Sequence, residues 1–225
     1  VGSDFTIEFW AKIDDLSNQA SSVDDWWKIY SKLVKWQIDF DNQKEESLVQ
    51  ILKQQFNSIN KMFSEFVVSN YSKWLVSDQR PILSCDIFSK KIKPLLEDEK
   101  KTCLVVMDAM RLDQFIELEK IFSEDFTVKM EPSFSLIPSA TPFSRNAIFS
   151  GLFPDEMCRI YPEQKKSMIE QGGSLNNFEK EFLADQMNRN GYLEKKMHYH
   201  KIWIADEGKK FLSKINNYTN YDLLA

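Results

Sequence analysis

The sequence predicts an α/β protein: a helical bundle followed by an incomplete α/β sandwich with a mostly parallel sheet. Three observations lead to this prediction. Apolar residues recur every three or four positions through about residue 76, short apolar runs alternate with helical patterns after residue 100, and the last residues read as a strand that is cut off as it begins. The expected modules are a three-helix bundle or linker module at 1–80 and the first part of the α/β domain at 81–225.

The first module is predicted to contain three amphipathic helices. The first helix is expected to start at Asp4, which can cap it, and to end in the polar segment 17–22. The second is expected to start near Ser22 or Asp24 and to weaken at Asp41. The third carries an apolar seam with alternating spacings of four and three, formed by Leu48, Leu52, Phe56, Ile59, Phe63 and Phe66. Three such helices joined by short breaks are typical of a small bundle.

Tryptophan is concentrated in this first module. Five of the six tryptophans lie there, namely Trp10, Trp26, Trp27, Trp36 and Trp74. A small bundle can bury two or three indoles, and such large rings are rarely hidden completely. We expect the surplus to contact the α/β domain or a second chain, the alternative being that all of them form the bundle's own core.

The second module begins after a junction at 77–83, where the period changes. The run 102–107 is short, apolar and rich in β-formers, which predicts a strand buried on both faces of a parallel sheet. Helices are expected at 112–122, 142–150, 178–190 and 207–216, and extended segments at 126–130, 133–137, 197–204 and 221–225. We expect Gly191 to close the helix at 178–190.

Composition excludes several classes of protein. The net charge of −5, from 29 basic and 34 acidic side chains, speaks against duplex DNA binding, which requires a basic face. No apolar run approaches 18 residues, and no signal peptide is visible at the first residues, so no membrane association is expected. The three cysteines are widely spaced and fit neither a disulfide framework nor a CxxC zinc site. A reducing, cytoplasmic setting is therefore expected.

Two residues stand where an α/β sheet usually carries its chemistry. Asp108 directly follows the apolar run 102–107, and carboxylates at rigid strand ends are common metal ligands. Thr141 stands where an extended segment gives way to a helix, with Pro142 at the first helical position. Its hydroxyl would then lie beside free backbone N–H groups that bind phosphate oxygens. The simpler alternative for each residue is a helix N-cap.

Together these two positions resemble the alkaline phosphatase superfamily, most closely its phosphodiesterase branch. The resemblance rests on an Asp at a strand end, a Pro-x-x-Thr turn at 138–141, and a Ser-Gly-Leu-Phe-Pro run at 150–154. The finer pattern around Asp108 and through 139–151 resembles a PglZ domain. A helical bundle ahead of it, with the later segments 172–173 and 207–210, is similar to PorX-type response regulators, which are linked to the type IX secretion system.

The resemblance implies a metal-dependent phosphohydrolase. Asp108 matches the family's first-strand metal ligand, and Thr141 matches its nucleophile, which also touches the metal. Two metal ions, usually zinc, activate the attacking hydroxyl and clamp the phosphoryl oxygens in that family. The remaining ligands come from Asp-x-x-x-His and Asp-His-Gly segments, whereas this sequence has no Asp-His pair and only two histidines. It therefore supplies at most part of a metal site, and these 225 residues alone are expected to be inactive.

Several other side chains are weaker candidates. Arg111 and Arg145 are possible phosphate contacts, the alternative being ion pairs at the surface or at a hinge. Ser144 and Asn146 lie in the same predicted helix as Thr141 and are possible pocket residues. Two histidines, His198 and His200, have H-x-H spacing. They are a possible metal-binding pair, the alternative being that they simply lie on one face of a strand.

Three functions therefore compete. The first is a zinc-dependent phosphodiesterase on small or cyclic oligonucleotides, within a PorX-like response regulator of type IX secretion. The second is a non-catalytic regulatory or dimerisation scaffold with a hydrolase-like core, and the third is the PglZ protein of a phage-defence system. For the first, the resemblance implies a sensor histidine kinase and a sigma factor as partners, and a homodimer is possible.

Overall fold

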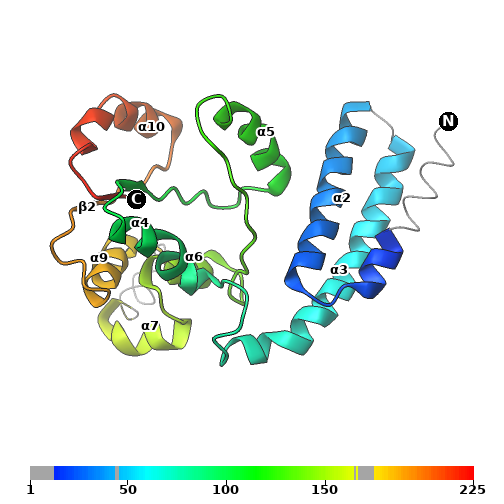
Figure 1. The fold of residues 1–225 in the computed structure, drawn as a ribbon, viewed down its shortest axis with the longest axis horizontal. Coiled ribbons are helices and arrows are strands. Elements are labelled where there is room, and N and C mark those ends of the chain that lie inside the picture. Colours follow the sequence, from blue (N-terminus) through cyan, green and yellow to red (C-terminus); the bar gives the residue numbers. More distant parts are fainter. Residues whose placement is uncertain (1–12, 44–45, 165, 167–174) are drawn as a thin grey trace. The chain divides into compact units, whose positions relative to one another are not determined.

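A computed structural model describes residues 13–43, 46–164, 166 and 175–225 of the chain (Figure 1). The chain divides into two compact units, which are Val1–Pro81 with Ala109–Pro132, and Ile82–Asp108 with Ser133–Ala225. Each unit has its own hydrophobic core and is treated separately below.

The first unit is helical, as predicted. Residues 13–19 are helical, followed by α2 (Val23–Gln43) and α3 (Glu46–Trp74), while the expected start of the first helix at Asp4 lies outside the described residues. The predicted start near Ser22 is confirmed by a reciprocal cap. The backbone N–H of Asp25 donates to the Ser22 hydroxyl at 3.2 Å, and the Asp25 carboxylate accepts from the Ser22 N–H at 3.0 Å. The helix continues through Asp41 and ends at Gln43, so the predicted end of the second helix lies within two residues of the observed one.

Apolar stripes of these helices form the core of the first unit. Its buried members are Ile13, Trp26, Ile29, Leu33, Leu52 and Ile59. Trp26 meets Phe63 edge-on with 5.6 Å between ring centroids, whereas Trp27 and Trp36 are only half-buried. Helix α5 (Leu112–Phe122), which has the predicted bounds, contacts α2 in the same unit. The bundle therefore buries some of its tryptophans and leaves others partly exposed.

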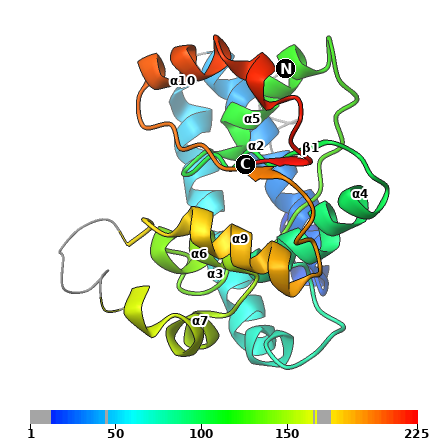
Figure 2. The same cartoon turned by 90° about the vertical axis from the view of Figure 1, so that its left-hand side faces the viewer.

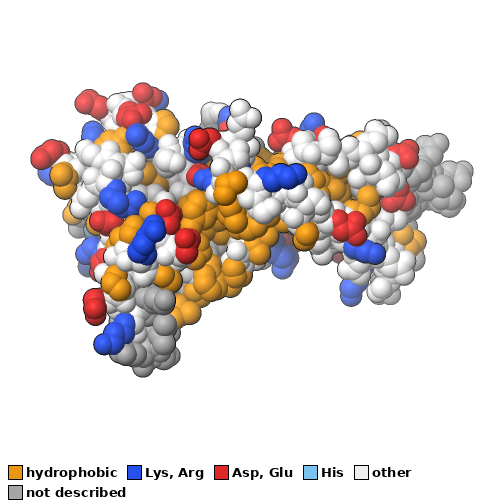
Figure 3. Space-filling view, turned by 90° about the horizontal axis from the view of Figure 1, so that it is seen from below, with side chains coloured by type: hydrophobic (Ala, Val, Ile, Leu, Met, Phe, Trp, Pro, Cys, Tyr) orange, Lys and Arg blue, Asp and Glu red, His pale blue; other side chains and the backbone are white. Residues whose placement is uncertain are grey.

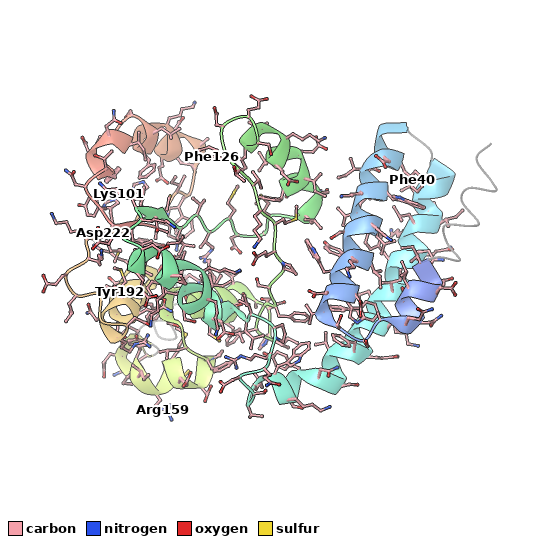
Figure 4. All side chains as sticks on the ribbon, in the orientation of Figure 1. Phe40, Lys101, Phe126, Arg159, Tyr192 and Asp222 are labelled. Carbon is pink, nitrogen blue, oxygen red and sulfur yellow. The ribbon has the colours of Figure 1, made fainter. Side chains whose placement is uncertain are left out.

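The second unit contains a three-stranded parallel sheet. Strand β3 (Leu223–Leu224) lies between β1 (Thr102–Cys103) and β2 (Met197–His198). Backbone hydrogen bonds continue past these short strands, for example from the Leu104 N–H to the Leu224 carbonyl at 2.8 Å. In Figure 4, the labelled Lys101 and Asp222 mark where β1 and β3 begin to pair, beside the 2.9 Å bond from the Thr102 N–H to the Asp222 carbonyl. The predicted parallel sheet and final strand are confirmed, although each strand is shorter than expected.

Helices cover both faces of this sheet, which makes the unit an α/β sandwich (Figure 2). On one face lie α6 (Thr141–Ser150) and α9 (Glu179–Arg189), which pack side by side. On the other lie α10 (Ala205–Leu212) and the 3-10 turn η3 (Ile215–Tyr218), which replace the single helix predicted at 207–216. The core on the first face is formed by Phe88, Ile92, Leu96, Phe149, Leu152, Met157, Phe182, Leu183, Met187 and Leu223.

The run 102–107 is not buried on both faces, contrary to the prediction. Leu104 and Val106 pack against the core, but Val105 and Met107, on the opposite face, are 71% and 52% exposed. The residues that cover that face of the sheet lie over β2, where the Tyr218 ring of η3 stacks on His198 with 4.3 Å between ring centroids. The apolar run 102–107 is therefore buried on one face only.

Other parts of the second unit were not predicted. Short helical elements occur at η1 (Ser84–Asp86), η2 (Phe88–Ile92), α4 (Lys93–Glu97) and α7 (Pro154–Ile160). The extended segments predicted at 126–130 and 133–137 form no strand among the described residues, except that Phe134 makes an isolated bridge with Leu83. Such segments become strands only when a partner strand is available, and that partner is not encoded locally.

Candidate functional site

Asp108 stands in a tight turn that follows the β1 strand direction. The next residue, Ala109, has a φ of +58°, an unusual conformation for a residue with a Cβ, so the chain bends sharply directly after the carboxylate. The Asp108 side chain is 48% exposed and therefore reachable from solvent. Strand β1 ends at Cys103, so Asp108 lies beyond the carboxyl end of the strand and does not follow it directly, which differs from the sequence prediction.

Thr141 is the first residue of α6, with Ala140 in the N-cap position and Pro142 following. Because Thr141 itself has joined the helix, its hydroxyl is not the cap, which removes the simpler of the two interpretations made from sequence. The hydroxyl instead donates to the Asp108 carboxylate, with 3.4 Å between Oγ1 and Oδ2. The second unit therefore brings the two principal candidates together.

Arg145 joins this pair from the next turn of α6. Its Nη1 donates to the same Asp108 oxygen at 2.9 Å, and its Nε donates to Glu179 Oε1 at 2.5 Å. An i, i+4 spacing places Arg145 and Thr141 on one face of the helix. The guanidinium is largely buried and bridges an accessible carboxylate and a hidden one.

Glu179 is the hidden carboxylate, with a side chain that is only 2% exposed. Its second oxygen accepts from the Tyr199 hydroxyl at 2.6 Å and from Lys201 Nζ at 2.8 Å. Burial and the neighbouring Glu179 carboxylate raise the pKa of Tyr199, which therefore remains a protonated donor. Two carboxylates, Asp108 and Glu179, are thus balanced by two cations, Arg145 and Lys201.

Sequence reasoning missed Glu179, Tyr199 and Lys201, although a signal exists for Glu179. The buried face of α9 consists of Glu179, Phe182, Leu183, Gln186 and Met187, so a carboxylate occupies the first position of an apolar stripe. A charged residue in such a register is rarely buried unless it is paired. Lys201 follows β2, at the same end of the sheet as Asp108.

Amide side chains hold the first turn of α6. Asn146 is buried, and its Nδ2 donates to the Pro142 carbonyl at 2.9 Å and to the Leu175 carbonyl at 3.0 Å. Asn176 donates to Asn146 Oδ1 at 2.8 Å and to the Thr141 carbonyl at 3.3 Å. Asn146, which the sequence suggested as a possible substrate contact, thus serves the helix backbone in this structure.

The C-terminal end of α6 is held just as closely. Gly151 has a φ of +66°, and a Cβ built there would come within 2.0 Å of the Gln186 amide. With its amide nitrogen facing the helix carbonyls, buried Gln186 donates to Phe149 O at 2.9 Å and accepts from the Gly151 N–H at 3.1 Å. The glycine of the Ser-Gly-Leu-Phe-Pro run is therefore required by backbone conformation and by space.

The contacts of the remaining candidate residues are made with groups other than the Thr141 side chain. Ser144 donates to the Ser139 carbonyl at 3.1 Å. Arg111 belongs to the first unit, where its Nε donates to Asp113 Oδ1 at 2.9 Å and lowers the pKa of that carboxyl. The two histidines share a face, as predicted, but they stack on aromatic rings: His198 on Tyr218, and His200 on Phe211 at 4.5 Å.

The described residues do not form a complete metal site. Asp108 and Thr141 offer two oxygen donors of the kind a hard cation accepts. However, no three His, Cys, Asp or Glu side chains gather within the described ranges so that they could hold a metal ion. In addition, the Arg145 guanidinium already places a positive charge beside the Asp108 oxygen. Any metal bound here would need further ligands.

The matches to family models define the class of protein, which is an alkaline phosphatase-like domain that follows a helical linker in the sequence. A family model described as the BREX system PglZ alkaline phosphatase-like domain matches residues 87–218, and a second, the PorX response regulator linker domain, matches residues 2–75. Because the first match covers more than half of the chain, the chain belongs to the PglZ alkaline phosphatase-like family. The two matches together indicate a PorX-like regulator with a phosphatase-like domain, which connects it to two-component signalling.

Three further findings bear on the interpretation. No curated protein matches the chain. Within the part of the chain that the structure describes, none of the helices combines the length and apolar character needed to span a bilayer. Among the described residues visible in Figure 3, basic and acidic side chains are interspersed.

Proposed function

We propose that this chain is part of a PorX-like two-component response regulator whose PglZ domain is a zinc-dependent phosphodiesterase on small or cyclic oligonucleotides. Its modules are the linker at 1–80 and the first part of the PglZ domain at 81–225. In this proposal the protein regulates type IX secretion from the cytoplasm, with a sensor histidine kinase and a sigma factor as partners, and it forms a homodimer.

One observation carries the catalytic part of the proposal: the half-buried Thr141 hydroxyl, at the start of α6, donates to Asp108 at 3.4 Å. Backbone N–H groups at a helix start bind phosphate oxygens. In the proposed step, Asp108 orients the Thr141 hydroxyl, Thr141 Oγ1 forms a bond to phosphorus, and its proton is taken up by solvent water. The ester oxygen leaves with the electron pair of its P–O bond, and water later cleaves the threonine phosphoester. Arg145 stands close enough to Asp108 to offset its charge during the attack.

Zinc dependence is part of the same proposal and rests on the family, whose superfamily is typically metal-dependent. Asp108 and Thr141 would supply two of the ligands, and the others would come from outside the described residues. When bound, the metal would supply positive charge to the phosphoryl oxygens.

A substitution of the nucleophile tests this proposal. In the full-length protein, Thr141→Ala is expected to reduce hydrolysis of bis(p-nitrophenyl) phosphate at least about 100-fold, because the covalent route is lost. Its melting temperature should change little, since Thr141 does not cap α6. Thr141→Ser, which keeps a hydroxyl, should retain measurable turnover, and Thr219→Ala, at an exposed threonine, should behave as wild type. Activity of Thr141→Ala within about tenfold of wild type, a barrier change of about 1.4 kcal/mol, refutes the nucleophile assignment.

The second candidate function is a non-catalytic scaffold with a hydrolase-like core. The observation that favours it is the Arg145 guanidinium on Asp108, which already compensates the carboxylate without a metal ion. Under this alternative, the full-length protein would hydrolyse no phosphodiester with or without added zinc, and Arg145→Met would lower its stability.

A further inference from the structure

The polar cluster beneath α6 contains side chains that reach neither the Thr141 hydroxyl nor the Asp108 carboxylate directly. Glu179 is its centre, and it is held by three donors from α6 and from the segment that follows β2. An isolated buried carboxylate is costly, by several kcal/mol in typical cases, so such a group persists when its partners are well placed. The cluster is therefore a fixed arrangement around which the neighbouring helix start is built.

Two chains of contacts run from Glu179 to the two sides of Thr141. One passes through Arg145, which spans from Glu179 Oε1 at 2.5 Å to Asp108 Oδ2 at 2.9 Å. The other passes from Lys201, whose Nζ donates to the Asn176 carbonyl at 2.7 Å. Asn176 in turn donates to the backbone carbonyl of Thr141 at 3.3 Å. One chain thus fixes the hydrogen-bond partner of the Thr141 hydroxyl, and the other fixes its backbone.

We infer that Glu179 is a positioning residue, which orients Arg145 against Asp108 and ties the first turn of α6 through Lys201. This inference rests on the proposed function, because it concerns the same hydroxyl. Glu179 touches neither Thr141 Oγ1 nor Asp108, so it acts only through its neighbours. Its loss should displace the reacting groups while leaving the substrate's own contacts in place.

Kinetics of the full-length protein test the inference first. Glu179→Gln is expected to lower kcat for bis(p-nitrophenyl) phosphate at least about tenfold, because small misplacements of reacting groups are costly. KM should stay within about threefold. The matched control is Asp185→Asn on the same helix, which removes an ion pair with Arg189 (2.8 Å) that is not part of the cluster. It should leave kcat within about twofold. A Glu179→Gln variant with wild-type kcat, or an equal loss in Asp185→Asn, overturns the inference.

A double-mutant cycle provides a readout that needs no turnover. Asp108→Asn and Glu179→Gln are combined, and unfolding is measured by denaturant titration. If Glu179 holds Arg145 against Asp108, Glu179→Gln already weakens the Arg145–Asp108 ion pair, so the combined rise in the unfolding constant should fall short of the product of the single effects by about threefold or more. Direct repulsion between the two carboxylates, or an Arg145 that needs only one of the two counter-ions, would produce the opposite sign. In an Arg145→Met background the shortfall should disappear.

The two experiments separate the inference from the function on which it rests. A full-length wild-type protein without turnover refutes the proposed function, whereas absent or opposite coupling in the cycle refutes the positioning role. If Glu179→Gln does not fold, Lys201→Met replaces it. That variant removes the bonds from Nζ to Glu179 and to the Asn176 carbonyl but leaves Arg145 in place. It is expected to lower kcat with KM unchanged, and an unchanged kcat overturns the inference.

Discussion

Replacing Gly151 by alanine should destabilise the second unit more than any other glycine-to-alanine change that the structure describes. The residue has a φ of +66°, and L-residues with a Cβ lose about 1–2 kcal/mol in that conformation. The new Cβ would also come within 2.0 Å of the Gln186 amide, so the buried Gln186 side chain must move.

The magnitude follows from what Gln186 would lose. Its amide donates to Phe149 O at 2.9 Å and to Ile148 O at 3.3 Å, and it accepts from the Gly151 N–H at 3.1 Å. At about 1 kcal/mol for each hydrogen bond, two or three lost bonds cost about 2–3 kcal/mol. Adding the conformational term, Gly151→Ala should lower the free energy of unfolding by about 3–5 kcal/mol.

Gly191 supplies the matched control. Its φ is +84°, which confirms that it closes α9 in a left-handed conformation, but a Cβ there would meet nothing within 4 Å. Gly191→Ala should therefore cost only the conformational term, about 1–2 kcal/mol. Denaturant unfolding of both variants measures the difference directly. If Gly151→Ala costs no more than Gly191→Ala, the assigned contact between α6 and Gln186 is wrong.

The remaining predictions concern metal, pH and the bundle. Zinc removal by a chelator should abolish phosphodiester hydrolysis by the full-length protein, and added zinc should restore it. These 225 residues alone should show no turnover. Robust turnover by them would contradict the inference that their metal site is incomplete. Burial, helped by His200 and Lys180, lowers the pKa of His198 below its ordinary 6.5. The unfolded chain then binds a proton that the folded protein does not, so stability should be full above about pH 6.5 and decline as the pH falls from there toward the lowered pKa. His198→Phe should flatten that decline in thermal melts, and equal slopes refute the argument. Finally, Trp27→Ala or Trp36→Ala, each at a half-buried indole, should weaken either self-association, measured by analytical ultracentrifugation, or contact with the α/β domain, measured by limited proteolysis. If both variants behave as wild type in both assays, the bundle is a passive spacer.

Features with a local cause could be predicted from sequence. The start of α2 follows from the Ser22 and Asp25 side chains, which complete their cap within four residues of chain. The bounds of α5 follow from its own apolar pattern. The proximity of Asp108 and Thr141 needed one more rule, that strand ends and helix starts meet at one edge of an α/β sheet.

Features with a distant cause could not be predicted. The run 102–107 has the composition of a fully buried strand, yet Val105 is exposed because the cover on that face is supplied by α10 and η3 over β2. The burial of Glu179 depends on partners from α6 and from the segment after β2, and no local sequence pattern indicates these partners. In both cases the decisive neighbour is remote in sequence.

The strand order has a consequence for how the second unit folds. Strands β1 and β2 do not pair with each other, and each pairs only with β3, which follows both in the chain. Until residues near Leu223 have been synthesised, both earlier strands lack the central partner that satisfies their backbone groups, and each remains an open edge. Pairing across such long sequence separations is slow. The second unit should therefore complete its sheet late, after the locally determined helices of the first unit have formed, and ribosome-bound chains of increasing length would reveal that order.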